Sequence, residues 1–133
     1  MKGGAEMITK DILLAQYPTD IKNHVKRVAD MVKPFGKDYE IVALLHDILE
    51  DTNITYMELL NILPADIAED VLILTRHPSD KYFDYIKRIA GSSKRPIIVK
   101  YCDIVDHLHN KATLKPTLEK RYLKAKKILE EVM

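Results

Sequence analysis

The polar residues most able to do chemistry follow the most apolar stretch of the chain. His46 and Asp47 come directly after the run Ile-Val-Ala-Leu-Leu at 41–45. A buried imidazole beside a buried carboxylate is costly unless each has a partner, and one divalent cation satisfies both. Because adjacent residues of a helix point about 100° apart, the other ligands of such an ion must come from other helices.

Two further segments with helical spacing offer those ligands. His24 precedes an apolar stripe that begins at Val25, and Asp103 lies inside the apolar sequence VKYCDIVD. Two imidazoles and two carboxylates suit Mn²⁺, Fe²⁺, Co²⁺, Ni²⁺ or Zn²⁺ better than Ca²⁺. Such an ion lowers the pKa of a bound water and yields a nucleophile near neutral pH. We therefore expect a metal site made of His24, His46, Asp47 and Asp103.

A second pair of carboxylates follows one helical turn later. Glu50 is four residues after His46, and Asp51 is four residues after Asp47. Neighbouring carboxylates cannot both ionise freely, so one pKa rises and the pair can exchange protons with a substrate or water. Carboxylates at the end of a helix also oppose its dipole, which favours a functional role. We expect Glu50 and Asp51 to be catalytic.

Helical periodicity extends over nearly the whole chain and predicts an all-α bundle of about seven to eight helices. Thr19 or Asp20 is expected to cap the second helix, and Thr55 and Glu58 fit a capping box for the fourth. Ile8, Ile12, Leu13 and Ala15 are expected to face inward from the first helix. The predicted helices cover residues 8–16, 19–33, 38–50, 55 onward, 64–75 with Pro64 as first helical residue, 82–90, 97–110, and a last one from Pro116 or Thr117 to the C-terminus.

Length and composition indicate one globular domain over residues 1–133, with 1–7 as a leader outside the fold. The 21 basic and 20 acidic residues give a net charge of +1, so a specific nucleic-acid partner is not expected. The single cysteine, Cys102, excludes an internal disulfide. No apolar run reaches the roughly 18 residues that span a membrane. These features favour a cytoplasmic protein, and the sequence leaves homo-oligomer formation open.

The order H24…H46-D47…D103 resembles that of the HD phosphohydrolase superfamily. The stretches HVKRVA, ALLHDILEDT, VLILTR, YFDYIKRI and VKYCDIVDHLHN are similar to the hydrolase domains of RelA/SpoT enzymes and to small phage and bacterial HD proteins, over about residues 20–125. The resemblance implies a helical bundle in which the two His and two Asp bind Mn²⁺, with Fe²⁺, Co²⁺, Ni²⁺, Zn²⁺ or Mg²⁺ as alternatives. It also implies that Glu50 and Asp51 orient or deprotonate the attacking water, or protonate the leaving group.

The implied activity is metal-dependent hydrolysis of a phosphate or pyrophosphate ester of a nucleotide, such as (p)ppGpp. The alternative is a non-catalytic metal-binding HD module with a sensory or structural role. RelA/SpoT hydrolases carry a basic RKxxxxPYI-like segment before the first His. Here the stretch ILLAQYPTDIKNH has no Arg or Lys before Lys22, so the sequence does not define the substrate.

The fourth metal ligand has two candidates. The family pattern VKxADxxxN selects Asp103, and His107 then stands where asparagine is expected. The sequence DHLHN instead selects Asp106, with Asn110 in the asparagine position. The apolar positions around Asp103 match the family pattern better than those around Asp106, so we prefer Asp103.

Cationic and aromatic side chains at the start of the sixth predicted helix could bind substrate. Lys81, Tyr82 and Arg88 follow the polar stretch RHPSDK, and ammonium and guanidinium groups pair with phosphate oxygens. The alternative is a solvated amphipathic face. His77, His107 and His109 are expected to be surface or capping residues, although any of them could contact a phosphate.

Overall fold

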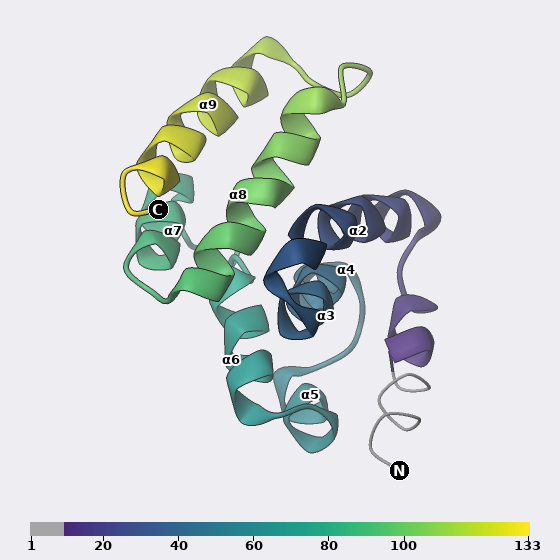
Figure 1. The fold of residues 1–133 in the computed structure, drawn as a ribbon. Coiled ribbons are helices and arrows are strands. Elements are labelled where there is room, and N and C mark those ends of the chain that lie inside the picture. The colour runs from purple at the N-terminus through teal and green to yellow at the C-terminus, as the bar shows by residue number, and fades with distance from the viewer. Residues whose placement is uncertain (1–9) are drawn as a thin grey trace.

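The computed structural model describes residues 10–133, and this part of the chain contains helices and no strands (Figure 1). The all-α prediction is therefore confirmed. Residues 10–14 form a short helix. The other elements are α2 (Thr19–Val32), η1 (Lys33–Phe35), α3 (Lys37–Leu45), α4 (Ile48–Asp51), α5 (Tyr56–Ile62), α6 (Ala65–Leu74), α7 (Tyr82–Ala90), α8 (Lys94–His109) and α9 (Pro116–Glu130).

Helix α8 lies at the centre of the arrangement. It packs against α2, α3 and α6 on one side and against α7 and α9 on the other, and Figure 1 shows it between these two groups. It begins at Lys94, three residues earlier than predicted. Pro96 is tolerated there because the first turn of a helix has no backbone hydrogen bond for the missing N–H to break.

The segment predicted as one helix over 38–50 is two helices. Helix α3 ends at Leu45, α4 begins at Ile48, and Asp47 between them has φ −102° and ψ 2°. The turn into α3 is made by Gly36, whose φ of 120° favours glycine. The break after α3 places His46 and Asp47 at a joint between helices rather than within one.

Helix ends agree with the sequence where a cap is specified locally. The capping box of Thr55 and Glu58 is present, and Pro116 is at the start of α9. The caps predicted at Thr19 or Asp20 are wrong, because Pro18 is the N-cap residue and no side chain caps α2. Pro64 is likewise the N-cap residue of α6 rather than its first helical residue.

The first helix faces the core with a different set of residues from the one predicted. Leu13 is buried as predicted, and Leu14 and, beyond the end of the helix, Tyr17 are buried too, whereas Ile12 is 58% exposed and Ala15 is exposed. The predicted buried face was rotated about the helix axis, because a helix this short has too few apolar positions to show which of its faces is buried. The predictions for Ile8 and for the leader 1–7 lie outside the described residues.

An ionic cluster joins α3, α6 and α8. The Arg95 guanidinium on α8 bonds to Asp70 and lies 3.0 Å from Asp66 Oδ2 and 3.6 Å from Asp38 Oδ2. Asp70 is buried, and a buried carboxylate is costly without a partner. The cluster therefore fixes how α8 lies against α6. No helix among residues 10–133 has the length and apolarity needed to cross a bilayer.

We predict that Arg95→Ala lowers the free energy of unfolding by about 3 kcal/mol, because it leaves the Asp70 carboxylate buried and unpaired. Urea denaturation followed by circular dichroism measures the change. Lys94→Ala, at the exposed neighbouring residue, is the control and should leave the midpoint almost unchanged. Equal midpoints for the two variants would contradict a stabilising role of the cluster.

Candidate functional site

Three elements bring the four predicted metal ligands together. His24 comes from α2, His46 and Asp47 from the joint between α3 and α4, and Asp103 from α8. One nitrogen or oxygen atom of each lies within 4.8 Å of those of the other three. His24 Nε2 is 2.7 Å and His46 Nε2 is 3.2 Å from Asp103 Oδ1. Asp47 Oδ2 is 3.8 Å and 3.4 Å from the same two nitrogens.

The second nitrogen of each imidazole is bonded away from this centre. His46 Nδ1 donates to the Ala43 carbonyl at 2.6 Å, and His24 Nδ1 donates to Asp106 Oδ2 at 2.6 Å. The Arg27 guanidinium holds Asp106 from the other side, at 2.9 and 3.0 Å. A proton on Nδ1 leaves the Nε2 lone pair available to a metal. The arrangement also separates the two candidate aspartates: Asp103 faces the centre, and Asp106 lies behind His24.

The electrostatics of the centre favour a cation. Burial alone would lower the pKa of His46, but the charges of Asp47 and Asp103 outweigh it and raise the pKa to about 9. Burial likewise disfavours the Asp103 carboxylate, yet Lys100 and His46 hold its pKa well below the usual range. Lys100 Nζ lies 2.7 Å from Asp103 Oδ2, which leaves Oδ1 facing the imidazoles. This negative potential and the mixed N/O donor set fit a divalent transition metal.

Glu50 and Asp51 lie beside the centre, on α4. With Asp47 they form a second cluster of carboxylates whose oxygens are within 4.8 Å of one another. Loss of solvent around each carboxyl raises its pKa, and the charge of Asp47 adds to the effect. The Arg76 backbone N–H donates to Glu50 Oε1 at 2.5 Å. Sequence reasoning missed this contact, because a backbone donor leaves no signal in residue type.

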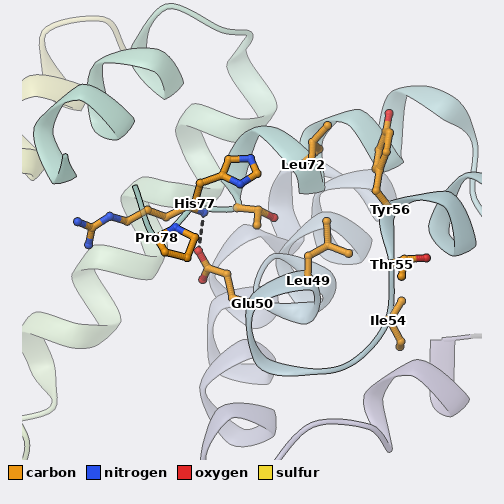
Figure 2. A pocket seen from close by; sticks show the side chains of 10 residues that line it. Leu49, Glu50, Ile54, Thr55, Tyr56, Leu72, His77 and Pro78 are labelled. Atoms are coloured by element: carbon orange, nitrogen blue, oxygen red, sulfur yellow. Dashed lines mark hydrogen bonds between the residues drawn. The ribbon is translucent and has the colours of Figure 1, made fainter. Parts of the chain in front are cut away.

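A pocket of about 780 Å³ adjoins Glu50. Figure 2 shows Glu50 at one end, close to His77 and Pro78, with Ile54, Thr55 and Tyr56 on the opposite side. Its walls are largely apolar, which is typical of sites for small organic ligands. The lining residues are Leu49, Glu50, Ile54, Thr55, Tyr56, Leu72, Thr75, Arg76, His77 and Pro78.

The three residues predicted to bind substrate differ in their surroundings. Arg88 is engaged locally, since it donates to Asp80 Oδ2 and to the Thr75 carbonyl, each at 3.1 Å. Lys81 is exposed and is the N-cap residue of α7. Tyr82 is half-buried, and its hydroxyl has no hydrogen-bond partner within the described part of the chain.

Two arginines contact the ring of Tyr82. Their guanidinium carbons, from Arg76 and Arg121, lie 5.4 and 4.8 Å from the ring centre. Burial, which outweighs the opposing charge of Lys100, raises the pKa of Tyr82 to about 12, so the hydroxyl stays protonated and can donate. Arg121 was missed from the sequence, because it lies in a helix whose many charges do not distinguish it.

His107 was expected to be a surface or capping residue, and its side chain is indeed 38% exposed, but it also contacts the centre. Its Nε2 lies 3.3 Å from Asp103 Oδ1, and its ring stacks on that of His24 with centroids 4.5 Å apart. The spacing of four residues between Asp103 and His107 on α8 was the available signal, since residues four apart share a helix face. His77 and His109 are exposed.

No model of a protein family matches the chain. A guanosine-3′,5′-bis(diphosphate) 3′-pyrophosphohydrolase of Aquifex aeolicus is 33% identical over an alignment of 117 residues, which covers 83% of this chain and 16% of that protein. The chain thus spans about one sixth of the length of this relative.

The fold is similar to that of a metazoan orthologue of SpoT, which is described as hydrolysing ppGpp and having a role in starvation responses. The TM-score is 0.77 at 19% identity, over 96% of this chain and 84% of that one. The chain is thus similar in sequence to a part of the Aquifex protein and similar in fold to the metazoan SpoT orthologue, in agreement with its resemblance to HD domains of the RelA/SpoT type.

Proposed function

We propose that the chain is a metal-dependent phosphohydrolase that cleaves a phosphate or pyrophosphate ester of a nucleotide. The observation that carries the proposal is the convergence of His24, His46, Asp47 and Asp103, with the carboxylates of Glu50 and Asp51 alongside. The name of the Aquifex relative supports a (p)ppGpp-like substrate, and the resemblance to RelA/SpoT domains supports Mn²⁺. A cytoplasmic location belongs to the same proposal.

A divalent ion held by these four side chains would polarise a phosphoryl oxygen and lower the pKa of a water molecule. The carboxylates of Glu50 and Asp51 would then accept the proton that this water releases. Glu50 Oε1 is held by the Arg76 N–H, so Oε2 is free to accept a proton from the attacking water. Asp51 can share this role, because it belongs to the same cluster of carboxylates as Glu50 and its pKa is also raised.

We propose that the heterocyclic part of the substrate binds in the pocket next to Glu50. Leu49, Ile54 and Leu72 provide apolar contacts, and Tyr56 offers a ring and a hydroxyl. Tyr82 and Lys81 remain proposed phosphate contacts. Arg88 has a different role in this proposal: it holds the loop after α6 through Asp80 and Thr75.

We predict that Asp47→Asn weakens Mn²⁺ binding at least about 10-fold, because it removes an anionic ligand while keeping the size of the side chain. Isothermal titration calorimetry of metal-stripped protein measures the affinity. His109→Asn, in an exposed residue of α8, is the control and should bind Mn²⁺ as the unmodified chain does. Undiminished affinity in Asp47→Asn would remove Asp47 from the site.

We predict that Glu50→Gln retains Mn²⁺ but lowers kcat by a factor of about 100 or more, because the amide can accept the Arg76 N–H yet cannot take a proton. Phosphate or pyrophosphate release from ppGpp and a nucleotide panel measures turnover. Glu69→Gln, in an exposed residue of α6, is the control. A full rate in Glu50→Gln would exclude it as the base. Metal binding without turnover of any nucleotide would favour a non-catalytic module.

We predict that Ile54→Trp raises KM for the nucleotide about 10-fold while changing kcat little, because the indole fills part of the pocket and weakens binding of ground and transition states alike. Steady-state kinetics on the substrate found in the panel separate the two constants. Leu123→Trp, in an exposed residue of α9, controls for the added bulk. An unchanged KM would place the heterocycle elsewhere.

A further inference from the structure

Three imidazoles, rather than two, approach the same oxygen of Asp103. His24 Nε2, His46 Nε2 and His107 Nε2 lie 2.7, 3.2 and 3.3 Å from Asp103 Oδ1. The other oxygen, Oδ2, is occupied by Lys100 Nζ at 2.7 Å. Oδ1 is therefore the oxygen at which nitrogen donors from α2, the α3–α4 joint and α8 converge.

The spacing of His107 from Asp103 is that of two ligands of one ion. Ligand atoms that each lie about 2.1 Å from a metal are separated by about 3.0 to 3.4 Å in octahedral or tetrahedral geometry. The 3.3 Å between His107 Nε2 and Asp103 Oδ1 falls in this interval, as does the 3.2 Å for His46. The two residues are four apart on α8, so both side chains project from one face of the helix.

The ring of His107 is held in place by its neighbours. It stacks on His24 on one side, and it stacks on Tyr122 of α9 at 5.1 Å between centroids and 8° between planes. Its side chain is 38% exposed, against 9% for His24 and 2% for His46. His107 thus lies at the open edge of the centre, with its orientation fixed by packing.

We propose that His107 Nε2 is a third imidazole ligand of the ion held by His24, His46, Asp47 and Asp103. This inference rests on the proposed function only in requiring that the centre binds a divalent metal. His107 stands where the HD pattern has an asparagine, so this chain has an imidazole nitrogen donor at that position. The neutral imidazole adds a donor without adding charge to the two carboxylates.

A third imidazole changes which metal the centre prefers. Imidazole suits Zn²⁺, Fe²⁺ and Ni²⁺, whereas carboxylate, carbonyl and water ligands suit Mn²⁺ and Mg²⁺. We therefore expect the chain to favour Zn²⁺ and Co²⁺ over Mn²⁺ more strongly than a centre with two imidazoles would. Replacing His107 by asparagine should relax this preference.

The test uses the full chain, stripped of metal, and the variant His107→Asn. Competition titrations give the affinities for Zn²⁺, Co²⁺ and Mn²⁺, and visible absorption of the Co²⁺ form reports its ligands. Asp106→Asn is the matched comparison, since Asp106 orients His24 without facing the centre. His109→Asn is the control for an exposed histidine of the same helix. Circular dichroism of each metal-free variant checks the fold.

We expect His107→Asn to lower the ratio of Zn²⁺ to Mn²⁺ affinity at least about 10-fold and to alter the Co²⁺ spectrum, because a nitrogen ligand is lost. Asp106→Asn should lower the affinities for all three metals by a similar factor, about 10- to 100-fold, and leave the Co²⁺ spectrum unchanged. An unchanged ratio and spectrum in His107→Asn would overturn the inference and leave the proposed function standing. No metal bound to the unmodified chain would overturn both.

Discussion

The centre of this structure depends on one buried carboxylate that must be compensated. Asp103 is 3% exposed in the middle of α8, and a carboxylate so buried is costly unless it is paired and hydrogen-bonded. Its partners come from its own helix through Lys100 and from two other segments through His24 and His46. Satisfying Asp103 therefore requires α2, the α3–α4 joint and α8 to meet.

The break between α3 and α4 is part of the same requirement. In a continuous helix, His46 and Asp47 would point about 100° apart. With the helix interrupted, His46 Nε2 and Asp47 Oδ2 lie 3.4 Å apart and face Asp103 together. No proline or glycine marks this break in the stretch LLHDILED. The break coincides with the contact between His46 and Asp103, which lie far apart in the sequence. Because nothing in the local sequence marks the break, one helix was predicted over 38–50.

Local signals in the sequence could predict most of the fold and the four residues that converge in the candidate centre. Helical periodicity predicted the helical segments from α2 to α9, with α3 and α4 joined as one. The Thr55 capping box and the start of α9 at Pro116, one of the two predicted starts, depend on a few adjacent residues and agree with the sequence. The four polar residues in apolar surroundings do converge. His107 and the Arg76 N–H could not be placed, because their roles depend on which helices become neighbours.

Asp103 and Asp106, the two candidates for the fourth ligand, contact different nitrogen atoms of the His24 ring. Asp103 lies at Nε2 of His24 and Asp106 at Nδ1, and their spacing of three residues lets α8 present both to the same imidazole. The Arg27 guanidinium balances the charge of Asp106, so Asp106 can accept the Nδ1 proton of His24 in a hydrogen bond while the lone pair of Nε2 stays available to an ion. A carboxylate in this position raises the basicity of the opposite nitrogen. One face of α8 thus carries Asp103, which faces the centre, and Asp106, which orients the His24 ring of α2.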